Sequence, residues 1–449
     1  MPTSMLSRYT AVLVLLSPLS LVGCGGGGGA PSVRGPVGTF QSAPHIPNQP
    51  LGSSAIRHVV VIIQENRSFD NMFHGFPGAD SASSGASHHG NVQLQPVDLA
   101  SLDDIEHLHG TFEAEYDGGN MDGFDQAGVI TPPHKPSPRG ADLPYSYVPS
   151  SQLQPYWQLA ARYTLADRAF QSESGPSFPA HQYLIAAQSD NIPDGPDRTP
   201  WGCDAPSGTT ETQLNPSGGL VPGPFPCFSY ATLADELDAK GLDWRYYAPG
   251  LHQPAGSFDA YDAIRQIRYG PDWTTKIRTP ETGVLSDIAA GQLGAVTWVV
   301  PSAANSDHAG TGSATGPEWV ASVVDAIGAS PFWDSTAIFI LWDDWGGWYD
   351  HVVPPQYDLM GPGFRIPLIV VSPWARHGYV SHVTHEAVSI VKFIEDDFGL
   401  SSLGQADARA DNLSDCFDFS QRPGPLQAIR VTVTPAELMR GGDAPPDAQ

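Results

Sequence analysis

Four runs of apolar residues constrain the fold of this chain more than any other feature of its sequence. They lie at Val59–Ile63, Val296–Val300, Ala337–Leu341 and Ile366–Val371, and within each run the apolar residues are continuous instead of alternating with polar ones. Continuous runs of this length are typical of strands buried on both faces, as in a mainly parallel sheet. The sequence therefore predicts a mainly parallel sheet that is covered on both faces.

Segments with a helical pattern of apolar residues lie between these runs. The predicted helices are Pro155–Phe170, Phe178–Gln188, Tyr230–Lys240, Pro317–Ile327 and His385–Phe398. For the last of them we expect Thr384 as the N-terminal cap and an end near Gly399. Strands that alternate with helices predict an α/β fold of three layers, in which helices flank a central sheet.

The N-terminal residues are a processing segment and not part of the fold. Arg8 is followed by an apolar stretch that is too short to span a membrane, and the stretch ends in Leu21-Val22-Gly23-Cys24. This ending resembles a bacterial lipoprotein signal, which implies an exported chain that is acylated at Cys24. Gly at position 26, where Asp would signal inner-membrane retention, favours the outer membrane.

The rest of the chain is expected to hold one large domain. We expect a signal peptide at residues 1–23, a Gly/Pro-rich tether at 24–54, a catalytic domain at 55–430 and a tail at 431–449. The chain has 48 acidic and only 22 basic residues, which argues against nucleic acid as a partner and leaves the lipid anchor as the predicted membrane attachment. Cys203 and Cys227 are the preferred disulfide, with Cys416 free, although three cysteines allow three pairings.

Polar side chains follow three of the predicted strands. Glu65 and Asn66 follow the first strand, His308 lies in the loop after the second, and Asp343-Asp344 follows the third. Ligands bind at this edge of an open parallel sheet, and hard oxygen ligands suit a divalent cation. The alternative is structural, with the Asp343-Asp344 pair capping a strand and Glu65 paired with Arg67.

Ser177 stands directly before a predicted helix, in Gly175-Pro-Ser-Phe-Pro179. Its ordinary role there would be to cap the helix, but the same position directs a hydroxyl and free backbone N–H groups toward one point, which suits an anionic phosphoryl group. His107 is a candidate ligand or phosphate donor, with an ordinary loop histidine as the alternative. Asp350 and His351 are candidates for orienting the metal-binding carboxylates.

Four segments together resemble a known family. They are Glu65-Asn-Arg-Ser-Phe-Asp70, Asp117-Gly-Gly-Asn-Met-Asp-Gly-Phe124, Gly175-Pro-Ser-Phe-Pro179 and Trp342-Asp-Asp-Trp-Gly-Gly-Trp-Tyr-Asp-His351. In this order they look like the bacterial phosphoesterase family of phospholipases C and acid phosphatases. The resemblance runs from about Arg57 to Phe419, which is most of the chain after the predicted signal peptide.

This resemblance implies an alkaline-phosphatase-like fold, one divalent metal ion and a phosphate ester as substrate. By similarity, Ser177 would be the nucleophile that forms a phospho-enzyme, and His107 and His308 would bind phosphate or assist the leaving group. The resemblance assigns the metal to Glu65, Asn66, Asp343 and Asp344. Many phospholipases C have Asp-Glu where this chain has Asp343-Asp344, so the choice between a phosphomonoester and a phospholipid headgroup diester stays open.

Two other functions compete with phosphoester hydrolysis. A catalytically silent surface lipoprotein could keep the fold in order to bind a ligand or partner, but it would be free to lose the site residues. The other is a different phosphate- or sulfate-transfer enzyme of the same fold. A sulfatase would be expected to carry a Cys or Ser in a maturation motif such as Cys-x-Pro-x-Arg, and this chain lacks that motif.

Overall fold

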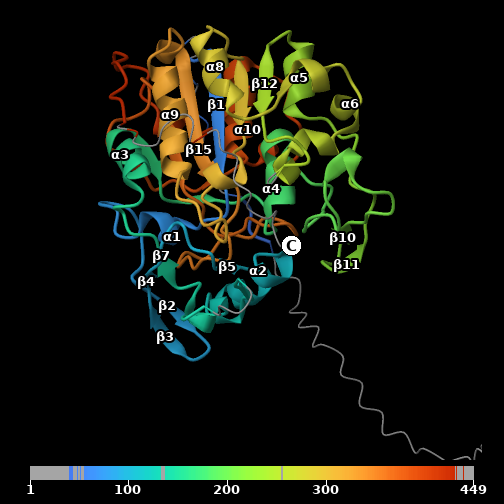
Figure 1. Cartoon of the computed structure of the whole chain (residues 1–449), viewed down its shortest axis with the longest axis vertical. Coiled ribbons are helices and arrows are strands. Elements are labelled where there is room, and N and C mark those ends of the chain that lie inside the picture. Colours follow the sequence, from blue (N-terminus) through green and yellow to red (C-terminus); the bar gives the residue numbers. More distant parts are fainter. Residues whose placement is uncertain are drawn as a thin grey trace, which may run out of the picture. The chain divides into compact units, whose positions relative to one another are not determined.

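An eight-stranded sheet organises the computed structural model of this chain (Figure 1). The structure describes residues 40–43, 48, 51, 55–132, 137–253, 256–429, 431 and 438. The strand order across the sheet is β13 (Ile277–Arg278), β12 (Trp244–Tyr247), β14 (Val296–Val299), β1 (His58–Gln64), β15 (Thr336–Trp342), β16 (Leu368–Val371), β8 (Thr164–Ala166) and β17 (Tyr379–Ser381). The predicted signal peptide, Cys24 and most of the predicted tether and tail lie outside the described residues.

The sheet is parallel except at β16, which runs antiparallel to both β15 and β8. The central strands β14, β1 and β15 are in parallel register, and they are buried along their whole length apart from the partly buried His58. Because their apolar residues are nearly continuous, the strands bury apolar side chains on both faces of the sheet. The predicted mainly parallel sheet is therefore confirmed.

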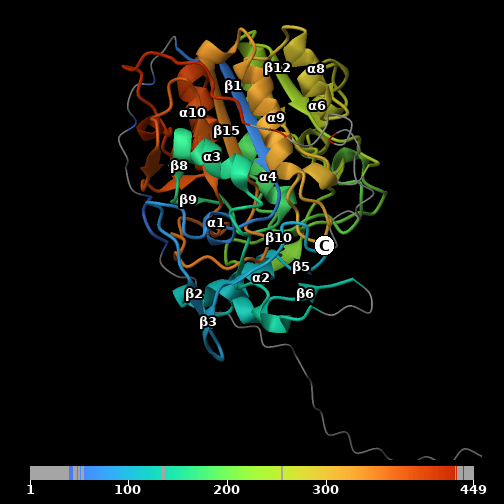
Figure 2. The ribbon, with the colours of Figure 1, turned by 60° about the vertical axis from the view of Figure 1, so that its left-hand side comes forward.

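Helices cover both faces of this sheet (Figures 1 and 2). On one face α9 (Gly316–Gly328) packs against both α3 (Gln154–Arg162) and α8 (Gly283–Ala289). On the other, α4 (Ser177–Ala186) packs against α5 (Leu233–Ala239) and α10 (Ser389–Phe398). The predicted α/β class with a helix-flanked sheet is therefore confirmed.

Shorter elements surround these layers. The remaining helices are α1 (Phe69–Phe73), α2 (His109–Tyr116), α6 (Arg265–Arg268) and α7 (Asp272–Thr275). The remaining strands form pairs: β2 (Ser84–Ser87) with β3 (Gly90–Gln93), β4 (Gln95–Pro96) with β7 (Ser146–Tyr147), β5 (Asp104–Ile105) with β6 (Val129–Ile130), β9 (Ala169–Phe170) with β18 (His385–Glu386), and β10 (Thr212–Leu214) with β11 (Leu220–Pro222). Cys203 and Cys227 form a disulfide, the pairing preferred from the sequence, and Cys416 is a buried free thiol.

Two predicted helices are too long. The helix expected at Pro155–Phe170 ends at Arg162, because the chain then forms β8 and β9, whose backbone groups pair with other strands. The helix expected from His385 begins at Ser389, since His385–Glu386 is strand β18. Its N-cap is therefore Val388 and not Thr384, whereas Gly399 ends it in the left-handed conformation, as predicted.

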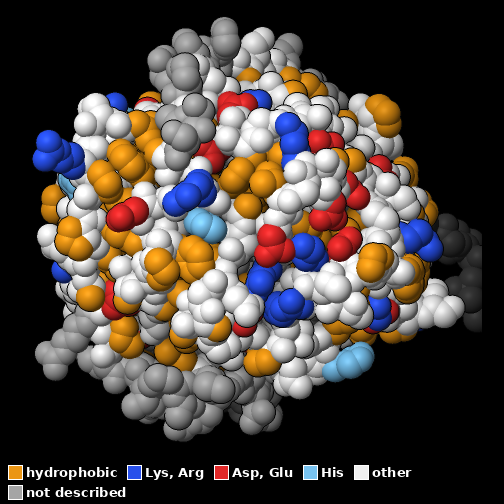
Figure 3. Space-filling view, turned by 90° about the horizontal axis from the view of Figure 1, so that it is seen from above, with side chains coloured by type: hydrophobic (Ala, Val, Ile, Leu, Met, Phe, Trp, Pro, Cys, Tyr) orange, Lys and Arg blue, Asp and Glu red, His pale blue; other side chains and the backbone are white. Residues whose placement is uncertain are grey.

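Positive and negative side chains are interspersed on the face of the molecule seen in Figure 3. There Lys and Arg side chains lie among Asp and Glu side chains, with apolar groups between them. Among the residues that the structure describes, no helix combines the length and the apolar character needed to cross a bilayer.

Candidate functional site

The ends of β1 and β15 place four predicted site residues next to one another. The two strands pair in register as far as Gln64 and Trp342, so the residues that follow them start side by side. Asp343 donates its backbone N–H to the Gln64 carbonyl at 2.9 Å, and Asn66 donates its backbone N–H to Asp343 Oδ1 at 3.1 Å. Parallel pairing therefore turns two distant sequence motifs into one site.

The backbone after β1 turns sharply at Asn66, which has a φ of 60°. Asn is among the few residues other than Gly that adopt this left-handed conformation readily. Gly346 packs against the turn so closely that a Cβ there would lie 2.2 Å from the Asn66 carbonyl oxygen. The Gly346 N–H donates to Asp344 Oδ1 at 2.7 Å, so the glycine both admits the turn and orients a carboxylate.

Ser177 lies at the centre of this group and is completely buried. Its Oγ donates to Glu65 Oε2 at 3.1 Å and lies 3.4 Å from Asp344 Oδ2, and it accepts from Asn66 Nδ2 at 3.4 Å. The N-cap of α4 is Pro176, so Ser177 is the first residue of the helix and its side chain does not cap it. The alternative interpretation of Ser177 as a helix cap is therefore wrong.

His181 is a site residue that the sequence reasoning missed. It follows Ser177 by four residues on α4 and is buried, with Nε2 3.0 Å from Glu65 Oε1 and 3.5 Å from Asp343 Oδ2. Burial alone would raise the pKa of Asp343, but its interactions with His181, Glu65 and Ser177 together outweigh burial and lower that pKa. The i, i+4 spacing, which places both side chains on one face of a helix, was the available signal.

His107 and His308 reach the same region from two loops. His107 Nδ1 lies 2.7 Å from the Ile105 carbonyl, to which it donates, so Nε2 accepts from Asn66 Nδ2 at 2.8 Å. His308 is buried beside it, with the two ring centroids 6.0 Å apart, and its Nδ1 lies 2.6 Å from the Ala309 carbonyl. The contact with His107 holds the amide of Asn66 in one orientation.

Asp350 and His351 lie in a different cluster. Asp350 accepts from Arg365 at 2.7 and 3.0 Å and from the backbone N–H of Asp70 at 3.3 Å. His351 Nδ1 lies 2.6 Å from Asp70 Oδ2. Their contacts are thus with α1, Asp80 and Arg365, so any effect on the carboxylates predicted to bind metal would pass through the backbone after β1.

The contacts of Arg67 and Glu65 differ from those of the structural alternative. The guanidinium of Arg67 donates to the carbonyls of Asp307 and Leu99 and to Asn71 Oδ1. Glu65 instead holds Ser177 and His181.

The residues present fit a divalent cation. One ligand atom each from Glu65, His181 and Asp343 lies within 4.8 Å of the others. Asn66 Oδ1 and Asp343 Oδ2 are buried and make no hydrogen bond to any described residue, which is costly unless a cation or water satisfies them. Carboxylate and amide oxygens beside one imidazole suit hard or borderline divalent metals.

Comparisons with known proteins identify the family of this chain. The model of the Phosphoesterase family matches residues 56–401. Hemolytic phospholipase C of Pseudomonas aeruginosa is 25% identical over 460 residues, which cover 87% of this chain but only 59% of that enzyme. Phospholipase C A of Mycobacterium tuberculosis is 25% identical over 434 residues, covering 82% of this chain and 78% of that protein.

A plant protein and a solved structure are similar as well. Non-specific phospholipase C1 of Arabidopsis thaliana is 26% identical over 370 residues, covering 73% of this chain and 62% of the plant protein. The crystal structure of a protein in the alkaline phosphatase superfamily from Vibrio parahaemolyticus aligns with a TM-score of 0.39 and 11% identity, over 82% of this chain and 72% of that one. Because its model matches more than half of the residues, the chain belongs to the phosphoesterase family.

Proposed function

We propose that this protein hydrolyses phosphoric esters with Ser177 as the nucleophile. The observation that carries the proposal is the setting of the Ser177 hydroxyl, which is buried between the carboxylates of Glu65 and Asp344 and the amide of Asn66. A hydroxyl that only stabilised a helix would not need two carboxylate acceptors brought from separate strands. Buried acceptors of this kind are what a serine needs in order to lose its proton during attack.

The first half of the reaction transfers the phosphoryl group to the protein. Ser177 Oγ forms a bond to phosphorus while the bond from phosphorus to the leaving alcohol oxygen breaks. The Ser177 proton passes toward Glu65 Oε2, to which the hydroxyl already donates. In the second half, water attacks the phosphoserine, and the Ser177 oxygen leaves and recovers a proton.

The first turn of α4 contributes to binding the phosphoryl oxygens. Its leading N–H groups have no partner within the helix, and the helix dipole places partial positive charge at this end. Ser177 is the first residue of this ten-residue helix, so the nucleophile and these donors face the same group. This arrangement suits an anion at the helix N-terminus.

One divalent cation is part of the proposal, with Glu65, Asn66, Asp343 and Asp344 as its ligands and His181 beside them. When bound, such a cation stabilises negative charge on the phosphoryl group and lowers the pKa of a hydroxyl next to it. His181 holds Glu65 and Asp343 together, and His107 fixes the Asn66 amide so that Nδ2 faces the site carboxylates and His107 itself. His107 and His308 are proposed to contact phosphate oxygens or the leaving group.

The substrate class follows from the relatives and not from the geometry alone. Several similar proteins are phospholipases C, which supports a phosphate diester of a lipid headgroup, whereas the Asp343-Asp344 pair favours a phosphomonoester. The chain spans only 59% and 54% of the two Pseudomonas aeruginosa phospholipases C. We further propose export and attachment to the outer membrane through acylated Cys24, which lies outside the described residues.

The experiment compares chromogenic phosphomonoester and phosphorylcholine diester substrates with the whole protein, Ser177→Ala and Ser322→Ala. Ser322 is a matched control, because its hydroxyl only bonds the Glu318 carbonyl within α9. We expect turnover of one ester to fall by about 10³-fold or more in Ser177→Ala and to stay unchanged in Ser322→Ala. Acid-quenched wild-type protein should carry one phosphoryl group on the Ser177 peptide. Full activity of Ser177→Ala would remove the nucleophile assignment.

A further inference from the structure

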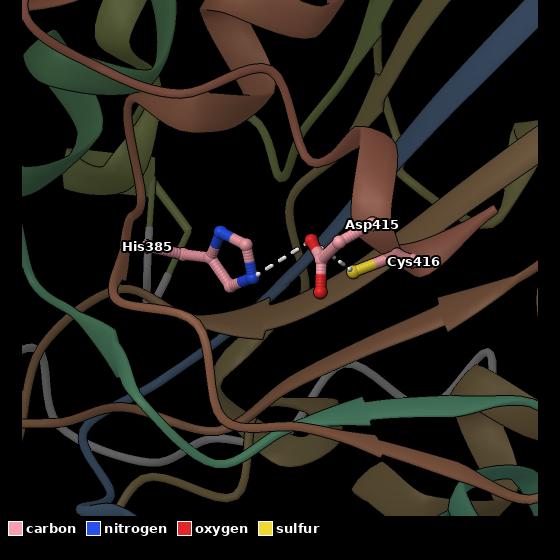
Figure 4. A group of neighbouring side chains, drawn as sticks. All are labelled: His385, Asp415 and Cys416. Atoms are coloured by element: carbon pink, nitrogen blue, oxygen red, sulfur yellow. Dashed lines mark hydrogen bonds and ion pairs between the residues drawn. The ribbon is translucent and has the colours of Figure 1, made fainter. Parts of the chain in front are cut away.

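A second group of metal-ligating side chains lies apart from Ser177, where the C-terminal segment meets the sheet. It consists of His385 on β18 and of Asp415 and Cys416 on a single turn at Ser414–Cys416 (Figure 4). His385 and Cys416 are fully buried, whereas the side chain of Asp415 is 26% exposed. Figure 4 shows His385 Nε2 and Cys416 Sγ both directed at the carboxylate of Asp415. Three side chains that can bind a metal are thus largely buried together, and such an arrangement requires an explanation.

All three ligand atoms lie within 4.8 Å of one another, and two of their separations are those of ligands to one ion. His385 Nε2 lies 3.3 Å from Asp415 Oδ1, and Cys416 Sγ lies 3.7 Å from the same oxygen. Ligands bound to tetrahedral Zn²⁺ at about 2.0–2.3 Å are separated from one another by roughly 3.3–3.8 Å. A charge-assisted hydrogen bond would instead bring nitrogen and oxygen to about 2.7–2.9 Å.

The other side of His385 is arranged as in a histidine that binds a metal. Its Nδ1 lies 2.8 Å from Asp411 Oδ2, and Asp411 is held in turn by the Ser389 hydroxyl at 2.7 Å and the Leu413 N–H at 2.8 Å. A carboxylate on one ring nitrogen fixes the tautomer and leaves the other nitrogen to bind metal. In the described part of the chain no Lys or Arg forms an ion pair with Asp411 or Asp415, so the positive charge here must come from His385 or from a cation.

From this geometry we infer that His385, Asp415 and Cys416 bind one Zn²⁺ ion, which fastens the C-terminal segment to the sheet. Nitrogen, oxygen and sulfur ligands together favour Zn²⁺ over Mg²⁺ or Ca²⁺. Binding releases the thiol proton of Cys416 and any proton on His385 Nε2. Ser381 Oγ, 3.2 Å from that nitrogen and donating to the other Asp415 oxygen, or a water completes the coordination. This site is independent of the function proposed for Ser177.

Cobalt provides the test, because Co²⁺ bound to a thiolate gives a charge-transfer band in the near ultraviolet and Co²⁺ bound at the Ser177 site does not. Co²⁺ is added to the full chain, to Cys416→Ser, to His385→Asn and to Cys24→Ser, with circular dichroism as the check on folding. We expect one equivalent of the thiolate band in the wild type and in Cys24→Ser, and its loss in Cys416→Ser. In His385→Asn the band should require roughly tenfold more Co²⁺ or more.

A second measurement compares the wild type with Cys416→Ser, which keeps the Ser177 site intact. Zn²⁺ should raise the thermal unfolding midpoint of the metal-stripped wild type by roughly 5 °C or more beyond the rise in Cys416→Ser, since an ion that binds only the folded state stabilises it. Inorganic phosphate and a substrate are left out, so this result is separate from activity. Absence of the thiolate band in folded wild-type protein, or its survival in Cys416→Ser, would overturn the proposal.

Discussion

Two groups of charged residues, most of them buried, lie near the ends of β1 and β15, and they differ in how their buried charges are neutralised. The Arg365 cluster contains Asp70, Asp80, Asp350, His351 and Arg365. The Ser177 cluster contains Glu65, Asn66, Ser177, His181, Asp343 and Asp344. Both gather three carboxylates, but only the first has an arginine among its members.

Every nitrogen of the Arg365 guanidinium is used within the protein. Nε and Nη2 donate to the two oxygens of Asp350 at 2.7 and 3.0 Å, and Nη1 donates to the carbonyls of Asp80 and Asp167. His351 adds contacts to Asp70 and Asp80 at 2.6 and 3.1 Å. The carboxylates of this cluster thus have cationic partners within the chain, and these contacts join α1 to the loop after β15.

The Ser177 cluster is left incomplete by the described residues. Asn66 Oδ1 and Asp343 Oδ2 are buried without a hydrogen bond, and His181 is the only basic side chain among its members. Burying unsatisfied groups costs stability, and proteins tolerate this cost where function requires it. The difference teaches that the unbalanced cluster, and not the more highly charged one, is the better candidate for binding a ligand.

The largest predicted effect is the loss of stability in Arg365→Met, which tests whether the Arg365 cluster is structural. The variant leaves Asp70 and Asp350 buried without their cation, and breaking a buried ion pair in this way costs about 3–5 kcal/mol. Urea unfolding at neutral pH measures the loss. Arg198→Met is the matched control, because Arg198 and Asp197 are about half exposed and 3.8 Å apart, so the change should cost below ~1 kcal/mol. Equal losses in the two variants would contradict the structural role of Arg365.

Asp343→Asn should affect activity more than stability, the reverse of Arg365→Met. We expect ester hydrolysis to fall by roughly 10²-fold, because a cation ligand is neutralised. The free energy of unfolding in metal-free buffer should fall, but by less than in Arg365→Met, because the lowered pKa of Asp343 means that the fold favours its charged form. Parallel activity assays and urea titrations with chelator measure both quantities. A variant that lost stability but kept its activity would place Asp343 with the structural residues instead.

A smaller effect is expected for His181→Gln. His181 supports Glu65 and Asp343 instead of reacting, so its loss should weaken cation affinity by about 10- to 100-fold. Activity measured against cation concentration should then recover at high concentration, which distinguishes a positioning residue from a catalytic one. His377→Gln, an exposed histidine, is the control. No change in the cation requirement would exclude His181 from the site.

Much of the architecture could be predicted from the sequence because its signals are local. The strands β1, β14 and β15 are mainly apolar runs that the sequence marks clearly. Glu65, Asn66, Asp343 and Asp344 directly follow two of these strands, so they could be predicted to lie at one edge of the sheet. The edge strand β13 has only two residues, Ile277–Arg278, which is too short for any periodic signal. Such a strand exists because β12 offers it backbone partners, and that information is not local.

Some residues of the two clusters could not be predicted for the same reason, namely that no local sequence signal marks them. His181 lies within a helix whose residues are all buried, so no polar face marked it for function. Arg365 is paired with Asp70, 295 positions earlier in the chain, and only the folded sheet brings the two together. The prediction that a helix continues through Thr164–Ala166 was wrong for a related reason. Strand pairing with β16 and β17 overrides the local preference of those residues.

The smallest predicted effect concerns pH and His351. Burial alone would lower the pKa of His351, but its hydrogen bond to Asp70 and the charges of Asp70 and Asp350 outweigh burial and raise it above 6.5. A histidine whose pKa is raised by folding stabilises the native state below its unfolded pKa, and that contribution is lost as pH rises through the folded pKa. The difference in unfolding free energy between the wild type and His351→Asn should therefore be greatest near about pH 5.5 and shrink toward about pH 9. Urea titrations of both proteins across this range measure the difference directly, and other titrating groups cancel in it. A difference that grew with pH would mean that His351 is neutral in the fold, and the Arg365 cluster would then depend on Arg365 alone for its positive charge.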